Sequence, residues 1–180
     1  MMGGDRTMQH NEVRDVFAQV MRDAGHVVET EPVLLKLDDE VFDYKCANKE
    51  NDARSDIKAT GFWRGMRQAY FDVKVVSPFA RSNSHKSPAS ILEAAEKVKM
   101  REYKQQIREV DHGDFNRLVF STVGAMAPQC QMVVKKLVEN LSARRGLNRS
   151  VVIGWLRVRL SFALLRTTLM CVLNLMSISQ

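Results

Sequence analysis

The chain has 180 residues, of which 45% are hydrophobic, so it is long enough for one domain with a substantial buried core. Its net charge of +6 is uneven, because the residues from Pro128 onward contain eight Lys or Arg and only one acid, which suits a polyanion binder or a solvated helix face. Three widely spaced cysteines exclude a zinc motif and an even disulfide framework, and residues 1–15 lack the apolar core of a signal peptide, so the nucleus or cytoplasm is expected rather than secretion.

The N-terminal quarter predicts one helix followed by extended chain. Residues 1–9 are polar and predict a leader without regular structure. Asn11 is the expected N-cap of an amphipathic helix, whose apolar residues recur at i, i+3, i+4 and i+7 until Gly25. The segment 27–37 then predicts an extended strand interrupted by a proline, and 38–53 predicts a polar, acidic loop.

Two strands that carry charged residues are expected next, over 54–60 and 69–76, as the arms of a hairpin. In the second strand Asp72 and Lys74 alternate with apolar residues, so both would lie on the face opposite to the apolar one. Pairing with the first strand would bring Asp56 alongside. Two carboxylates and an ammonium group that converge can hold a divalent cation and activate water for phosphodiester hydrolysis. The alternative is a pair of exposed strand acids, although acids are depleted within strands.

The C-terminal half predicts helices on either side of one apolar strand. Pro88 is expected at the first position of a long helix that continues to about residue 110. A buried strand is expected over 118–123. Pro128 begins a further helix that ends before Gly146, and the last helix continues to about residue 176.

The last helix contains an apolar run over residues 160–176. This run is short for a bilayer and contains Arg166. We therefore expect a helix that packs in the core or forms a dimer, and no membrane span.

Several motifs occur in an order that resembles one nuclease superfamily. They are His10-Asn11-Glu12-Val-Arg14-Asp15, Asp56-Ile-Lys-Ala-Thr-Gly-Phe-Trp63, Phe71-Asp72-Val-Lys74-Val-Val-Ser-Pro78, Tyr103, Arg108-Glu-Val-Asp-His112-Gly113-Asp-Phe115 and Leu118-Val-Phe-Ser-Thr-Val-Gly124. The series resembles the PD-(D/E)XK, or restriction-endonuclease-like, nuclease domain found downstream of reverse transcriptase in invertebrate retroelement polyproteins. The resemblance covers roughly residues 9–176. Ser55 departs from the motif, which has proline there.

This resemblance implies an α/β fold with a restriction-endonuclease-like core, in which helices flank a central mixed sheet. The core would span 10–127, and the basic helical extension over 128–180 would pack on the same domain. The implied function is a metal-dependent DNA endonuclease of retroelement origin, which nicks target DNA to release the 3′-hydroxyl that primes reverse transcription. DNA and the reverse transcriptase region of the same polyprotein are the implied partners, and the oligomeric state stays open. The alternatives are a catalytically inactive nuclease fold that binds nucleic acid or a protein, and a superfamily exonuclease.

The same resemblance implies a catalytic set of Asp56, Asp72, Lys74 and Glu12. Mg²⁺ or Mn²⁺ would be held by Asp56, Asp72 and the carbonyl of Val73, and Lys74 would act on the attacking water or the phosphate. His10 is expected to contact this cluster. The alternative for Glu12 is that it only stabilises the N-terminal end of its helix.

Basic and aromatic residues outside this set are the predicted contacts with nucleic acid. Their alternative role is to form the solvated or half-buried faces of helices and turns. They are Arg64, Arg67, Lys99, Tyr103, Lys135, Lys136, Arg144 and Arg145.

Overall fold

The structure is a computed structural model that describes residues 3–33, 55–109 and 112–177, without the side chains of 3–6, 99–106, 108–109 and 167–177. Three consecutive strands follow the first helix, and a fourth strand lies between the later helices. The order is α1 (Gly3–Asp23), β1 (Val27–Thr30), β2 (Ile57–Thr60), β3 (Gln68–Val76), a short 3₁₀ turn (Arg81–Asn83), α2 (Pro88–Glu109), β4 (Asp114–Ser121), α3 (Pro128–Arg145) and α4 (Arg149–Ser177).

The four strands form one mixed sheet in the order β1-β2-β3-β4. Strands β1, β2 and β3 pair antiparallel, which confirms the predicted hairpin, and β4 pairs parallel to β3. A parallel neighbour needs a crossover connection, and α2 supplies it. The fold is therefore α/β, with a mixed sheet flanked by helices.

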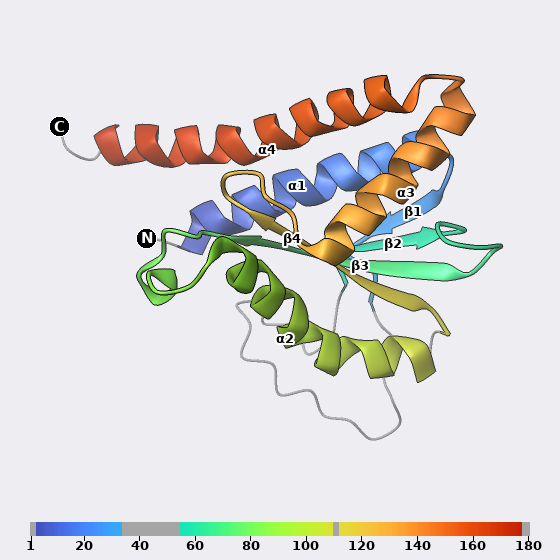
Figure 1. Cartoon of the computed structure of the whole chain (residues 1–180), viewed down its shortest axis with the longest axis horizontal. Helices are drawn as coiled ribbons and strands as arrows, with labels where there is room; N and C mark the ends of the chain where they lie inside the picture. The colour runs from blue at the N-terminus through green and yellow to red at the C-terminus, as the bar shows by residue number, and fades with distance from the viewer. Residues whose placement is uncertain (1–2, 34–54, 110–111, 178–180) are drawn as a thin grey trace.

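The helices lie on both faces of this sheet (Figure 1). Helices α1, α3 and α4 lie on one side and α2 lies on the other. The main core lies on the first side, where Phe17 of α1, Phe71 of β3, Phe120 of β4 and Leu156 of α4 belong to one buried cluster. Strand residues alternate between faces, so Val119 packs on the opposite side in a smaller cluster with α2. The C-terminal helices thus share the core of the sheet.

Most predicted boundaries agree with the structure. Pro88 and Pro128 begin helices, and Gly146 ends α3 in the left-handed conformation, with a φ of 63°. Strand β4 spans Asp114–Ser121 rather than 118–123, because it pairs with β3 from Ala69 to Val76. The loop predicted over 38–53 lies outside the described residues.

The predicted leader is wrong for residues 3–9, which are helical, and Asn11 lies inside α1 rather than at its N-cap. A tertiary contact accompanies the longer helix, because the side-chain amide of Gln9 donates a hydrogen bond of 3.2 Å to the carbonyl of Leu164 in α4. Packing along α4 therefore supports helical turns that precede the local capping signal.

One face of α4 packs in the main core through Val152, Leu156 and Leu160, as expected for a core helix. None of the helices in the described part of the chain is both long and apolar enough to cross a membrane. The side chains of Cys46 and Cys171 lie outside the described residues, and Cys130 is a buried free thiol.

Candidate functional site

The carboxylate of Asp56 lies just before β2 and is held by α1 and β3. Its Oδ2 atom accepts a hydrogen bond of 2.6 Å from the main-chain N–H of Val73, and it lies 2.9 Å from Nε2 of His10. The hydroxyl of Ser55 donates to the carbonyl of Phe71 at 3.0 Å, which fixes the approach to β2. Asp56 is therefore tied to the residue that follows Asp72, as the predicted hairpin requires.

His10 joins this cluster from α1, as predicted. The hydrogen bond with Asp56 raises the pKa of the imidazole above its usual 6.5, while burial opposes the rise. The negative charges of Asp56 and Asp72 and a hydrogen bond with Asn11 raise the pKa further. His10 therefore lies in the field of both candidate carboxylates.

Asp72 lies on the expected face of β3 but is not open to solvent. Phe71 and Val73 on either side of it belong to the main core, which confirms the predicted alternation. Asp72 lies opposite Arg117 in the parallel register of β3 and β4, and Nε of Arg117 lies 3.2 Å from Oδ2 of Asp72. Their side chains are only 8% and 3% exposed. Asp72 is thus half of a buried ion pair, so the alternative of an exposed strand acid is wrong for this residue.

Lys74 and Glu12, the other two residues of the predicted catalytic set, lie in different environments. Lys74 follows Asp72 by two residues on the same face of β3 and is exposed to solvent. Glu12 is half-buried, and its Oε1 atom lies 3.6 Å from Nη1 of Arg166. The structure therefore brings Asp56 to the strand of Asp72 and Lys74, whereas Glu12 is engaged by α4.

The oxygen donors at this site suit a hard cation. Mg²⁺ is often bound through only one or two carboxylates, together with waters and substrate phosphates. Asp56 and Asp72 supply such carboxylates, and Val73, whose carbonyl is the third candidate donor, directly follows Asp72 in the chain. Across the described residues, no three His, Cys, Asp or Glu side chains are grouped so that they could hold a metal. The residues fit a site with two carboxylates, in which the guanidinium of Arg117 is the competing cation.

Two of the predicted nucleic-acid contacts lie at the turn between β2 and β3. Arg64 is exposed there. Arg67 donates a hydrogen bond of 3.0 Å to the carbonyl of His112, and its Nε lies 3.4 Å from Oδ2 of Asp114. This turn lies at the end of β3 away from Lys74 (Figure 1), so it is not part of the carboxylate cluster. The side chains of two further candidates, on α2, lie outside the described residues: Lys99 and Tyr103.

The remaining predicted contacts belong to α3. Lys135 is exposed and Lys136 is half-buried. Arg144 and Arg145 form the basic last turn of the helix, where Nη2 of Arg145 lies 3.0 Å from Oδ2 of Asp23. These residues form a basic surface on α3 rather than a part of the carboxylate cluster.

His26 lies beside this basic surface, and its Nε2 is 3.1 Å from the side-chain amide nitrogen of Asn140. Burial lowers the pKa of His26 below its usual 6.5, against a hydrogen bond with the Thr60 main chain, and the charges of Lys136 and Arg144 lower it further. The folded state therefore favours a neutral His26. Its contribution to stability is present above pH 6.5 and is lost as the pH falls from 6.5 through the lowered pKa.

Replacement of His26 by Gln is expected to reduce this loss of stability in acid, because glutamine does not titrate. The measurement is the free energy of unfolding in urea from about pH 8 to about pH 5 for both proteins. The advantage of the wild type over His26→Gln should shrink as the pH falls below 6.5. An equal pH dependence of the two proteins would contradict a lowered pKa.

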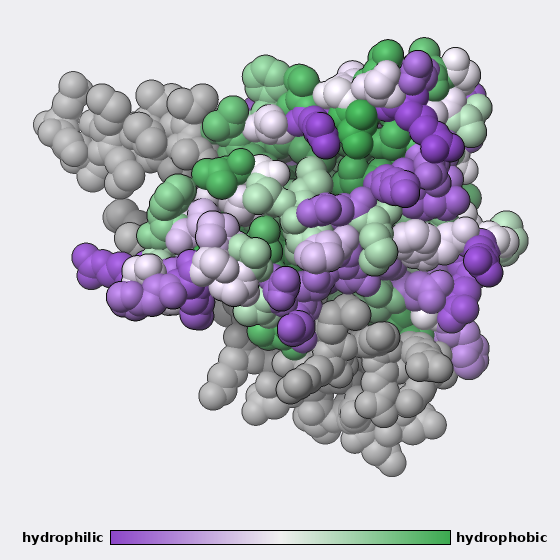
Figure 2. Space-filling model, viewed as in Figure 1, coloured by the Kyte–Doolittle hydropathy of each residue, from purple (hydrophilic) through white to green (hydrophobic). Residues whose placement is uncertain are grey.

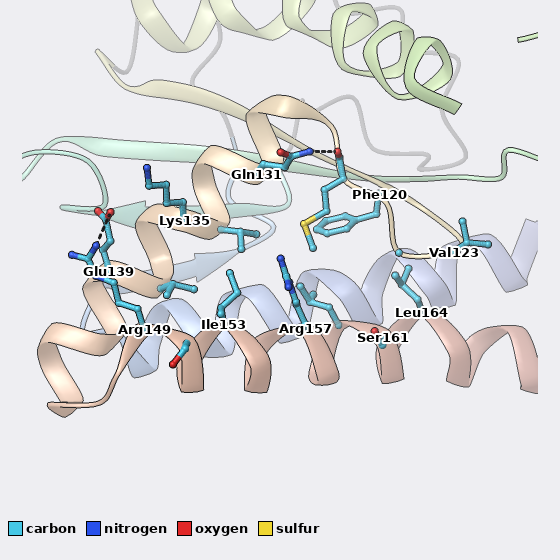
Figure 3. Close-up of a pocket in the computed structure, with 16 residues that line it drawn as sticks. Phe120, Val123, Gln131, Lys135, Glu139, Arg149, Ile153, Arg157, Ser161 and Leu164 are labelled. Carbon is cyan, nitrogen blue, oxygen red and sulfur yellow. Dashed lines mark hydrogen bonds and ion pairs between the residues drawn. The ribbon is translucent and has the colours of Figure 1, made fainter. Parts of the chain in front are cut away.

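A separate cavity of about 760 Å³ lies between α3, α4 and the end of β4 (Figure 3). Its wall is mainly apolar, and Phe120 and Arg157 point into it. At its edge Arg149 approaches Glu139 at 3.7 Å. Of the predicted site residues whose side chains the structure describes, only Lys135 lines this cavity. It is therefore distinct from the carboxylate cluster.

Arg117 is the residue of the cluster that the sequence did not reveal. The available signal was a cation directly before the apolar run Leu118-Val-Phe, where a buried strand was expected. Its partner depends on the register between two strands that are far apart in the chain.

Compared with known proteins, the sequence matches no family model, and no curated protein matches it significantly.

Proposed function

We propose that this domain is a metal-dependent DNA endonuclease with a restriction-endonuclease-like core. The observation that carries the proposal is the hydrogen bond from the N–H of Val73 to the carboxylate of Asp56. It brings an acid from before β2 to the strand that bears Asp72 and Lys74, as the motif requires. The order of α1, the antiparallel strands, α2 and the parallel β4 adds support, since the resemblance implies a mixed sheet flanked by helices.

In this proposal Asp56 and Asp72 hold Mg²⁺ or Mn²⁺, with the carbonyl of Val73 as a third oxygen donor. A metal held there would supply Lewis acidity toward the scissile phosphate and toward a water molecule. Lys74 is exposed, and its ammonium group, a compact positive charge, binds the phosphate. The basic surface of α3 and the turn at Arg64 contribute contacts with the DNA backbone that are independent of sequence and sensitive to salt. Retroelement origin and a reverse transcriptase partner belong to the same proposal.

A second candidate is a nuclease fold that binds DNA without cutting it. The buried pair of Asp72 and Arg117 favours this candidate, because a guanidinium already neutralises one of the two carboxylates. The two candidates differ in one property. A nuclease needs a metal at Asp56 and Asp72, whereas DNA binding by a basic surface does not.

Nicking of supercoiled plasmid in Mg²⁺, Mn²⁺ or EDTA tests the proposal. Lys74→Ala is expected to slow nicking by about 10²- to 10³-fold, since the loss of one electrostatic contact to the reacting group has effects of this size. Lys74 is exposed, so its replacement should change the free energy of unfolding by less than about 0.5 kcal/mol. Lys86→Ala is the matched control, because Lys86 is also exposed and lies in the segment before α2.

Metal-dependent nicking that is lost in Lys74→Ala and kept in Lys86→Ala is the expected result. DNA retention without nicking in any metal would instead favour the second candidate. Nicking at the wild-type rate by Lys74→Ala would show that this lysine has no part in the reaction.

A further inference from the structure

A row of exposed apolar side chains runs along α4. Figure 2 shows apolar side chains gathered over this helix. We call it the outer row, and it consists of Val151, Trp155, Val158, Phe162 and Leu165, which are from 36% to 69% exposed. A contiguous row of large apolar side chains on a surface marks a site of interaction, whereas single exposed ones are ordinary.

The outer row has the spacing of a helix-packing seam. Its residues alternate between steps of four and three, which is the heptad pattern of two packed helices. The opposite face of α4 already packs in the core through Leu156 and Leu160, so the fold itself leaves the outer row uncovered. Helix α4 continues to Ser177, and the sequence keeps the same spacing at Leu169, Val172 and Met176.

The two flanks of the outer row differ in charge and size. Helical periodicity places Arg159 and Arg166, one heptad apart, on one flank, and the small residues Gly154 and Ser161 on the other. The guanidinium carbon of Arg159 lies 4.9 Å from the ring centre of Trp155, and that of Arg145 lies 5.9 Å from it. Positive charge is therefore held directly against an apolar member of the row.

The charge of α4 indicates what would cover the row. Residues 149–177 contain four arginines and no acid. A second copy of the chain would place two basic helices side by side, whereas acidic side chains beside a partner's apolar seam would pair with Arg159. They would also pair with Arg166, whose side chain is 72% exposed although it lies 3.6 Å from Glu12 of α1. We propose that the outer row binds an amphipathic helix of a protein partner, with acidic residues at heptad spacing along one flank of its apolar seam. This inference does not depend on the proposed nuclease activity.

The test uses the full chain and two labelled synthetic helices of roughly three heptads. Both have leucine in the seam, and the flanking positions are glutamate in one helix and lysine in the other. Fluorescence anisotropy should show binding of the glutamate helix and much weaker binding of the lysine helix. Phe162→Asp should weaken binding of the glutamate helix by about tenfold or more, because it sets an aspartate against the partner's apolar seam and acids. Met132→Asp is the matched control, since Met132 is 59% exposed on α3 and lies outside the row.

A reversal of charge on the flank of the outer row tests the preference for acidic partners separately from the apolar contact. The variant Arg159→Glu, which leaves the pair of Arg166 and Glu12 intact, should bind the glutamate helix more weakly and the lysine helix more tightly than the wild type does. Equal binding of both helices by the wild-type chain would overturn the proposal. Two other results would also overturn it. The first is sedimentation of the chain as a dimer that Phe162→Asp dissociates. The second is binding of the chain to phosphatidylserine vesicles without competition from the glutamate helix.

Discussion

Arg117→Met is expected to lower the free energy of unfolding by about 3–5 kcal/mol, because it removes the ion-pair partner of a buried carboxylate. The side chains of Arg117 and Asp72 are 3% and 8% exposed, so water compensates little for the lost charge. The double variant Asp72→Leu/Arg117→Met should be much closer to the wild type, since apolar residues often replace a buried ion pair at little cost. Urea denaturation of the wild type, Arg117→Met, Asp72→Leu and the double variant measures the coupling between the two residues.

The same variants test the metal site without any activity measurement. If Mg²⁺ can bind at Asp56 and Asp72, it should stabilise Arg117→Met more than the wild type, because no guanidinium competes for the carboxylate. The double variant, which lacks Asp72, is the control and should not respond. If Arg117→Met lowers the free energy of unfolding by less than about 0.5 kcal/mol, the ion pair of Arg117 and Asp72 does not form in solution.

Asp56→Asn is expected to slow metal-dependent nicking by about 10³-fold. A metal supplies several kcal/mol of transition-state stabilisation, and each 1.4 kcal/mol, roughly, corresponds to a factor of ten. Asparagine keeps an oxygen that can accept the hydrogen bond from the N–H of Val73, so the approach to β2 should survive. The plasmid assay, with circular dichroism to check folding, makes the comparison.

Asp15→Asn provides the matched control, because Asp15 is an exposed carboxylate on α1 that pairs with its neighbour Arg14 and lies outside the proposed catalytic set. It should nick DNA at the wild-type rate. Undiminished nicking by Asp56→Asn would show that this carboxylate has no part in the reaction, and it would contradict the proposed metal site.

The hairpin that carries the candidate site was predictable because its signals are local. The alternation of Asp72 and Lys74 with Phe71 and Val73 identifies a strand and its two faces. The short connection from the preceding strand requires an antiparallel return, which brings Asp56 close. The burial of Asp72 was not predictable in the same way, since alternation shows which face a residue occupies but not what covers that face.

The sequence by itself determined the order of the elements, the helix starts at Pro88 and Pro128, the end of α3 at Gly146 and the hairpin, because each depends on residues within a few positions. Only the tertiary structure decided the contacts between distant segments. The parallel register of β3 and β4 sets Arg117 beside Asp72, and α4 lies along the N-terminal turns of α1. Such contacts depend on which surfaces remain to be buried once the local elements have formed, and no local pattern specifies them.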